Sequence, residues 1–165
     1  MKTLYLIRHA KSSWKDLSLD DFDRPLNKRG KIDAPFMGEL LKGYEIVPDV
    51  IYSSPARRAK DTANIISEKI EYKKELIYDE KLYDFNFVSL EKIIKNINND
   101  NQSAFIFGHN PTFNIFADEY CEFYENIPTC GIVKLFFDCE KWEDISPTNC
   151  EFLEFEYPKK YLHKI

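Results

Sequence analysis

Short runs rich in Ile, Val, Tyr and Phe alternate along this chain with segments of helical periodicity. The strand-like runs cover residues 3–8, 50–53, 76–78 and 104–107, and helical patterns cover 30–43, 54–70, 89–97 and a stretch opened by Asn110-Pro111. Alternation of this kind is typical of a mainly parallel sheet with helices on both faces. The sequence therefore predicts an α/β fold, a three-layer α/β/α sandwich.

The pattern changes after Pro128. Residues 131–137 and 151–157 are β-rich, and no long helix separates them. They are expected to pair as added strands, antiparallel, at an edge of the sheet. Residues 18–30, dense in Asp and Arg, are predicted to form a long surface loop, and loops of that length are often functional.

Two of the helices have specific start signals or apolar faces. Ser54 is expected to be the N-cap of the helix at 54–70, with Pro55 at its first position. The inward face of that helix is predicted to hold Ala59, Thr62, Ala63, Ile66 and Ile70. The apolar positions of the helix at 30–43 are Ile32, Phe36, Met37, Leu40 and Leu41.

Length, charge and cysteine content set limits on function. A chain of 165 residues is expected to form one domain, residues 1–165, with a substantial core. A net charge of -5 argues against a nucleic-acid surface, and no apolar run is long enough to cross a membrane. The four cysteines show no C-x-x-C pair and no secretory leader precedes them, so we expect reduced thiols that act as apolar fillers, and a cytoplasmic location.

The polar residues at the strand ends point to a phosphate site. Arg8 and His9 end the first strand, Arg57 and Arg58 begin the helix after the second, and His109 follows the strand at 104–107. In a parallel sheet these segments emerge at one edge, where ligands bind. Two imidazoles and two or more guanidinium groups around one point suit a dianionic phosphoryl group.

This residue set predicts chemistry without a metal or other cofactor. A neutral imidazole can attack phosphorus in line and carry the phosphoryl group on nitrogen. Guanidinium groups then stabilise the anionic transition state. Paired histidines can also bind zinc or iron, but Arg8 and Arg58 would repel such a cation.

The same segments carry a family resemblance. Residues 8–14 (Arg-His-Ala-Lys-Ser-Ser-Trp), 53–59 with 61–63, and 108–111 (Gly-His-Asn-Pro) resemble the signatures of branch 1 of the histidine phosphatase superfamily, which includes the phosphoglycerate mutases. Residues 23–26 with Gly30, 126–131 and 157–160 look like the SixA group of phosphohistidine phosphatases. The resemblance runs almost end to end and implies a phosphoglycerate mutase-like fold.

The resemblance also implies residue roles. His9 would be the phosphorylated nucleophile, and Arg8, Arg58 and His109 would complete the phosphate pocket. Arg24 is a weaker candidate for a pocket contact. Arg58 is preferred to Arg57 because the family pattern places its arginine directly before an alanine, as Arg58 stands before Ala59.

The chain departs from the family pattern at two points. Ala10 replaces a common glycine, which changes little beyond backbone freedom. Mutases and ester phosphatases of the branch carry a glutamate after the third strand, whereas here Glu80 and Asp84 are candidates for a general acid without a clear match. A pocket without a strong acid would favour phosphohistidine over ordinary esters, because an imidazole leaves a phosphoramidate far more easily than an alkoxide leaves an ester.

The favoured hypothesis is therefore a metal-independent phosphatase that removes phosphate from protein phosphohistidine. A phosphatase of a small phosphorylated metabolite is the enzymatic alternative. A non-catalytic module that binds a phosphorylated partner is the alternative outside enzymes. The sequence leaves open the oligomeric state and whether the loop at 18–30 closes over the substrate, and His163 is expected at the surface.

Overall fold

A computed structural model describes residues 1–162, so His163 lies outside the described residues. The centre of the fold is a six-stranded sheet with the strand order β3-β2-β4-β1-β5-β6. The strands are β1 (Lys2–Arg8), β2 (Val50–Ser53), β3 (Ile77–Tyr78), β4 (Ser103–Gly108), β5 (Ile132–Phe137) and β6 (Cys150–Glu156).

The sheet is mixed, as the sequence predicts. The strands β3, β2, β4 and β1 run parallel to one another. Strand β5 pairs antiparallel with β1, and β6 pairs antiparallel with β5. The two β-rich runs after Pro128 are thus added strands, with β6 at the edge. The parallel part places the carboxyl ends of β1, β2 and β4 side by side.

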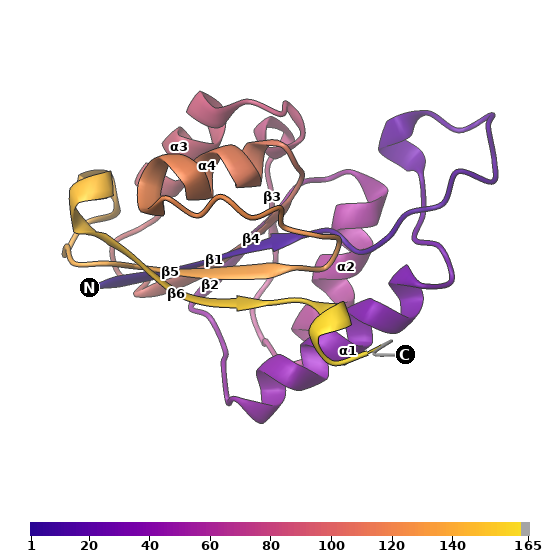
Figure 1. Cartoon of the computed structure of the whole chain (residues 1–165), viewed down its shortest axis with the longest axis horizontal. Coiled ribbons are helices and arrows are strands. Elements are labelled where there is room, and N and C mark those ends of the chain that lie inside the picture. The colour runs from indigo at the N-terminus through magenta and orange to yellow at the C-terminus, as the bar shows by residue number, and fades with distance from the viewer. Residues whose placement is uncertain (163–165) are drawn as a thin grey trace.

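Helices cover both faces of the sheet, which confirms the predicted three-layer α/β/α sandwich (Figure 1). Helices α1 (Gly30–Gly43) and α2 (Arg57–Lys69) pack together on one face, and α3 (Phe87–Lys95) and α4 (Thr112–Cys121) on the other. A separate apolar cluster fills each layer between helices and sheet. The strands in the middle are buried from both sides, which explains their continuous apolar runs.

Helix α2 begins later than the sequence predicts. Its first residue is Arg57 and its N-cap is Ala56, so Ser54 is not the cap. The backbone N–H of Ser54 donates to the carbonyl of Phe107 at 2.9 Å, which extends the sheet ladder by one residue. The hydroxyl of Ser54 is thereby left at the sheet edge. The predicted inward face of α2 is buried as expected.

Helix α1 has the predicted bounds, but not every apolar position of its sequence pattern is buried. Ile32 is 52% exposed. The apolar residues of α1 that are buried are Ala34, Met37 and Leu41, and Gly38 is buried with them. Gly38 allows close packing of α1 against α2, since a Cβ there would lie 2.7 Å from the Lys69 side chain.

The segment between β1 and α1 is the long loop that the sequence predicts, with one short 3-10 helix at Asp21–Asp23. It projects past the end of β1 (Figure 1). Its two arms are joined where Ser12 forms an antiparallel bridge with Leu26, and the N–H of Asn27 donates to the carbonyl of Lys11 at 2.9 Å. These bonds hold the loop beside the sheet edge.

Two other features of the described chain bear on the predictions. No helix within residues 1–162 is long and apolar enough to cross a membrane. All four cysteines are free thiols; Cys130 is buried, and Cys121, Cys139 and Cys150 are half-buried. Burial raises the pKa of the Cys130 thiol, so this group stays protonated.

Candidate active site

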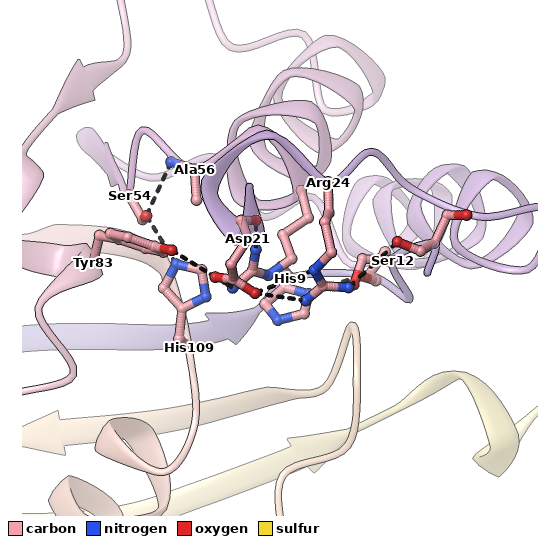
Figure 2. Close-up of polar contacts among 11 residues, drawn as sticks. His9, Ser12, Asp21, Arg24, Ser54, Ala56, Tyr83 and His109 are labelled. Atoms are coloured by element: carbon pink, nitrogen blue, oxygen red, sulfur yellow. Dashed lines mark hydrogen bonds and ion pairs between the residues drawn. The ribbon is translucent and has the colours of Figure 1, made fainter. Parts of the chain in front are cut away.

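The ends of β1 and β4 bring two histidines together. Arg8 pairs with Gly108 in the parallel ladder, and the N–H of His9 donates to the Gly108 carbonyl at 3.1 Å. The rings of His9 and His109 follow directly, with centroids 5.2 Å apart. Both side chains are buried, and Figure 2 shows them next to each other.

The histidines lie in a cavity of about 260 Å³ at this edge of the sheet. Its lining is formed by Arg8, His9, Lys11, Ser12, Trp14, Arg24, Arg58, Phe85, His109, Asn110 and Thr129. This lining contains four permanent cations and no carboxylate. A group that enters the cavity therefore meets a strongly positive field, although the whole chain carries a net charge of -5.

His9 presents one ring nitrogen as a nucleophile. Its Nδ1 lies 2.7 Å from the carbonyl oxygen of Ala10. A carbonyl oxygen only accepts hydrogen bonds, so Nδ1 must carry the proton and Nε2 the lone pair. Burial lowers the pKa of His9 to about 3, and the charges of Arg58 and Arg8 act in the same direction against the opposing bond to Ala10. The ring is therefore neutral at ordinary pH.

His109 is fixed by the serine at the end of β2. Its Nε2 lies 2.8 Å from the Ser54 hydroxyl, which also accepts the N–H of Ala56 at 3.2 Å (Figure 2). Burial, followed by the neighbouring His9 and Arg58, lowers the pKa of His109 to about 2. Its Nδ1 is buried and forms no hydrogen bond within residues 1–162. This nitrogen can therefore bond to a group bound in the cavity.

Arg58, which is buried, and Arg8, which is half-buried, flank the histidines. Arg8 donates from Nη1 to the Ile127 carbonyl at 3.0 Å, and Arg58 is only 3% exposed. In each of them Nε is buried and forms no hydrogen bond within the described part of the chain. Burial lowers the pKa of Arg8, and the charge of Arg58 adds to that effect. Two like charges held this close favour an anion between them.

Arg24 reaches the same cavity from the long loop. Its guanidinium group stacks 3.6 Å above the ring centroid of Trp14, and its Nη1 donates to the Ser12 hydroxyl at 2.7 Å. The side chain is 7% exposed. The structure thus places the weaker sequence candidate with the stronger ones, and Trp14 forms a cavity wall while remaining 66% exposed.

Asp21 is the residue that sequence reasoning missed. Its carboxylate binds Arg58 at 3.0 Å and Arg24 at 3.1 Å, and it also accepts the hydroxyl of Tyr83 (Figure 2). Partial burial alone would raise the pKa of Asp21, but the bonds from Tyr83 and Arg58 outweigh it and lower the pKa to about 2. The signal available in the sequence was an acid three residues before Arg24. Among four aspartates at positions 16–23, nothing in the sequence distinguishes it.

The two candidate general acids are not brought into the cavity. Glu80 and Asp84 are exposed, and neither lines it. The 3-10 helix Glu80–Tyr83 turns the chain so that Tyr83 and Phe85 face His109 instead, with ring centroids 5.5 and 5.1 Å from it. The side chains that this segment places next to His109 are therefore aromatic and not acidic.

Arg57 also lies outside the cavity. It is exposed on the first turn of α2 and pairs with Asp61 at 3.6 Å. The preference for Arg58 over Arg57 as the pocket arginine agrees with this geometry. Within residues 1–162 no group of three or more His, Cys, Asp or Glu side chains is arranged to hold a metal ion.

Known proteins share both the sequence pattern and the fold. A family model described as the histidine phosphatase superfamily, branch 1, matches residues 4–119. Phosphoglycerate mutase 1 of Saccharomyces cerevisiae is 42% identical over 73 residues, which are 43% of this chain and 30% of that protein. The matched stretch spans about a third of the length of the curated relatives.

Solved structures match over nearly the whole length. A crystal structure assigned as the phosphohistidine phosphatase SixA of Agrobacterium tumefaciens has a TM-score of 0.82 at 25% identity and covers 95% of this chain and 98% of its own. A protein histidine phosphatase SixA complexed with tungstate has the same TM-score at 18% identity, covering 96% of this chain and 98% of its own. At 18% identity, the similarity to the tungstate complex concerns the fold alone.

Proposed function

The chain belongs to branch 1 of the histidine phosphatase superfamily, and from that premise we propose that it is a metal-independent phosphatase that forms a phosphohistidine intermediate on His9. The observation that carries the proposal is the neutral Nε2 of His9 in a cavity lined by guanidinium groups and by no carboxylate. That combination binds a phosphoryl dianion and offers it a nucleophile in the correct protonation state.

The proposed reaction has two steps. In the first, Nε2 of His9 attacks phosphorus, a new N–P bond forms, and the leaving group departs with the electrons of its bond to phosphorus. In the second, water attacks the phosphohistidine, the N–P bond breaks, and inorganic phosphate is released with neutral His9. Arg8, Arg58 and Arg24 would hold the phosphoryl oxygens in both steps, and His109 would bond to one of them through Nδ1.

No metal enters this scheme because the cavity already contains the cations that a metal would supply. The guanidinium charges of Arg8 and Arg58 would repel a divalent ion at the same point. The charge stabilisation of the transition state is therefore assigned to side chains.

The proposed substrate is a phosphohistidine side chain of a protein. A departing imidazole needs little help from an acid, and the cavity lining supplies no acidic side chain. The cavity is also open to large partners, because Trp14 at its rim is 66% exposed and Leu17 on the same loop is 87% exposed. Exposed apolar side chains of this kind favour contact with a protein surface.

The test uses p-nitrophenyl phosphate and a histidine-phosphorylated peptide, each with EDTA present. Wild-type protein should hydrolyse both and should trap an acid-labile phosphoryl group on His9 after rapid quenching. His9→Ala should lose turnover and labelling together. Activity unchanged in His9→Ala would show that the nucleophile is another residue, and loss of activity on chelation would refute a metal-independent mechanism.

A matched pair of neighbouring arginines controls for general charge effects. Arg58→Ala should reduce kcat/KM by about 100-fold or more, because it removes a buried donor from the phosphate site. Arg57→Ala removes the same charge from the exposed side of the same helix turn. It should stay within about twofold of wild type. Phosphate binding without any turnover in the wild type would instead identify a non-catalytic binding module.

A further inference from the structure

A second cavity adjoins the proposed phosphate site. It has a volume of about 350 Å³ and shares Arg8, Lys11 and Thr129 with the first. Its complete lining is Arg8, Lys11, Arg29, Asn126, Pro128, Thr129, Tyr157, Pro158 and Lys159. We call this cavity the basic groove. A molecule whose phosphoryl group reaches His9 can therefore extend directly into the groove.

The groove is lined by four cationic side chains and by no acidic one. They come from three distant segments: the end of β1 with the loop after it, the residue before α1, and the 3-10 helix Pro158–Lys160. Lys11 and Lys159 are exposed, and neither forms an ion pair within residues 1–162. Arg29 lies 3.4 Å from Asp33 but remains 37% exposed. The charges of Lys11 and Lys159 are therefore not balanced by an ion pair within the described residues, and they favour an anionic ligand.

Arg29 also lines a further hollow of about 420 Å³, together with Lys15, Asn27, Lys28 and Ile32. Cationic side chains beside the phosphate cavity therefore line two hollows that share Arg29. The lining thus combines cations with apolar surfaces, among them Pro128, Pro158 and the half-exposed Ile32. A chain of alternating acidic and apolar side chains matches both features.

We propose that the basic groove binds acidic side chains next to the phosphohistidine of a protein substrate. The inference rests on the proposed function, because His9 must hold the phosphoryl group for the flanking residues to reach the groove. Carboxylates of the substrate would pair with Lys159, Arg29 and Lys11. The groove would then select among proteins that carry phosphohistidine by the charge of the flanking residues, which the phosphate pocket itself does not contact.

The experiment compares two histidine-phosphorylated peptides that differ only in flanking residues, glutamates in one and glutamines in the other. Wild-type protein should have a kcat/KM about tenfold higher for the glutamate peptide at low salt, and added salt should reduce the ratio. Lys159→Glu should reduce the ratio by about threefold to tenfold. Lys73→Glu makes the same charge change at an exposed residue outside the groove and should leave the ratio unchanged.

Three other outcomes would contradict either the groove proposal or the proposed function. Equal rates on the two peptides, or equal losses in Lys159→Glu and Lys73→Glu, would refute the groove and leave the phosphatase proposal intact. If the wild type hydrolysed a small bisphosphate far better than both peptides and Lys159→Glu lost that activity, the occupant would be a small molecule. This result would refute the proposal that the groove binds a peptide. Failure of the wild type to hydrolyse either peptide would instead refute the proposed function.

Discussion

Asp21 forms an ion pair with Arg58 across 3.0 Å, although 37 positions separate them in the chain. The backbone carbonyl of Asp21 accepts a second bond from Arg58 at 2.8 Å, and its carboxylate also binds Arg24. One residue of the long loop therefore orients two guanidinium groups of the proposed phosphate site. From these contacts we expect Asp21 to position the two arginines and to compete with bound phosphate for the same donors.

These two roles predict opposite effects of Asp21→Asn. The kcat should fall by about tenfold because the guanidinium groups lose their fixed orientation. Inhibition by inorganic phosphate should tighten by about threefold to tenfold, because a negative charge beside the site is removed. Steady-state kinetics with added phosphate measure both quantities.

Asp23→Asn is the matched control for this variant. Asp23 belongs to the same 3-10 helix, is exposed, and forms no ion pair within residues 1–162. It should leave kcat and phosphate inhibition unchanged. If both variants behave like the wild type, Asp21 does not position the arginines.

The aromatic lining next to His109 predicts strong dependence on the leaving group. Phe85 lines the cavity beside His109, the lining holds no acidic side chain, and Asp21, whose pKa is about 2, is already ionised. Alkyl phosphates such as glycerol phosphate should therefore turn over about 10²- to 10⁴-fold more slowly than a phosphohistidine peptide. A series of esters with different leaving-group pKa values measures this dependence.

The exposed acids should not contribute to that reaction. Glu80→Gln and Asp84→Asn should keep kcat on alkyl phosphates within about twofold of wild type, because neither side chain lines the cavity. A tenfold loss in either variant would identify it as a general acid that reaches the leaving group when substrate binds.

The buried histidines predict a loss of stability on mild acidification. The pKa values of His9 and His109 are lowered to about 3 and about 2, whereas an unfolded chain protonates histidine near its ordinary pKa of about 6.5. Below about pH 6.5 the unfolded state binds protons that the folded state does not. Each histidine should then lower the free energy of unfolding by about 1.4 kcal/mol per pH unit as the pH falls.

Urea unfolding between pH 7 and pH 5 measures this slope. The range includes the ordinary pKa of histidine in the unfolded chain and lies well above the pKa of Asp21, about 2. His9→Gln and His109→Gln should each remove about half of the slope. A free energy of unfolding that is constant over this range would contradict the neutral state of the buried rings.

Gly30 predicts a steric effect close to the site. A Cβ at this position would lie 2.2 Å from the carbonyl oxygen of Lys11, so the loop beside His9 would have to move. Gly30→Ala should lower the free energy of unfolding by about 1–3 kcal/mol and reduce activity. Thermal unfolding and kcat/KM measure the two effects.

Gly43 provides the control at the other end of the same helix. A Cβ there meets no atom within 4 Å. Gly43→Ala should be neutral, or should stabilise the protein by up to about 1 kcal/mol, because alanine is the better helix residue. Equal destabilisation by both substitutions would argue against a steric cause at Gly30.

The sequence predicts those parts of the fold that depend on local periodicity. The strands and helices lie within a few residues of their predicted positions because apolar runs and amphipathic faces are local signals. The start of α2 was missed because Ser54 is drawn into the sheet by Phe107, a residue 53 positions away. No sequence feature near Ser54 predicts that hydrogen bond.

The candidate site likewise contains residues that the sequence predicts and residues that depend on long-range contacts. His9, Arg8 and His109 could be grouped in advance because parallel strands deliver their ends to one edge. The role of Asp21 could not be predicted, because its partners include Arg58 of α2 and Tyr83, which are distant in the sequence. The exclusion of Glu80 and Asp84 depends on the turn of a 3-10 helix, which only the folded backbone defines.

The backbone of His9 is held from two directions: its N–H donates to Gly108 and its carbonyl accepts the N–H of Cys130 at 2.9 Å, while Arg8 donates to Gly131 at 3.0 Å. A ribosome adds His9 more than a hundred residues before it adds Gly131. The nascent polypeptide thus possesses its proposed nucleophile early but acquires the scaffold around it only after Gly131 has been added. Hydrolytic competence should therefore appear only when the segment that contains Cys130 and Gly131 has been translated and has paired with the end of β1.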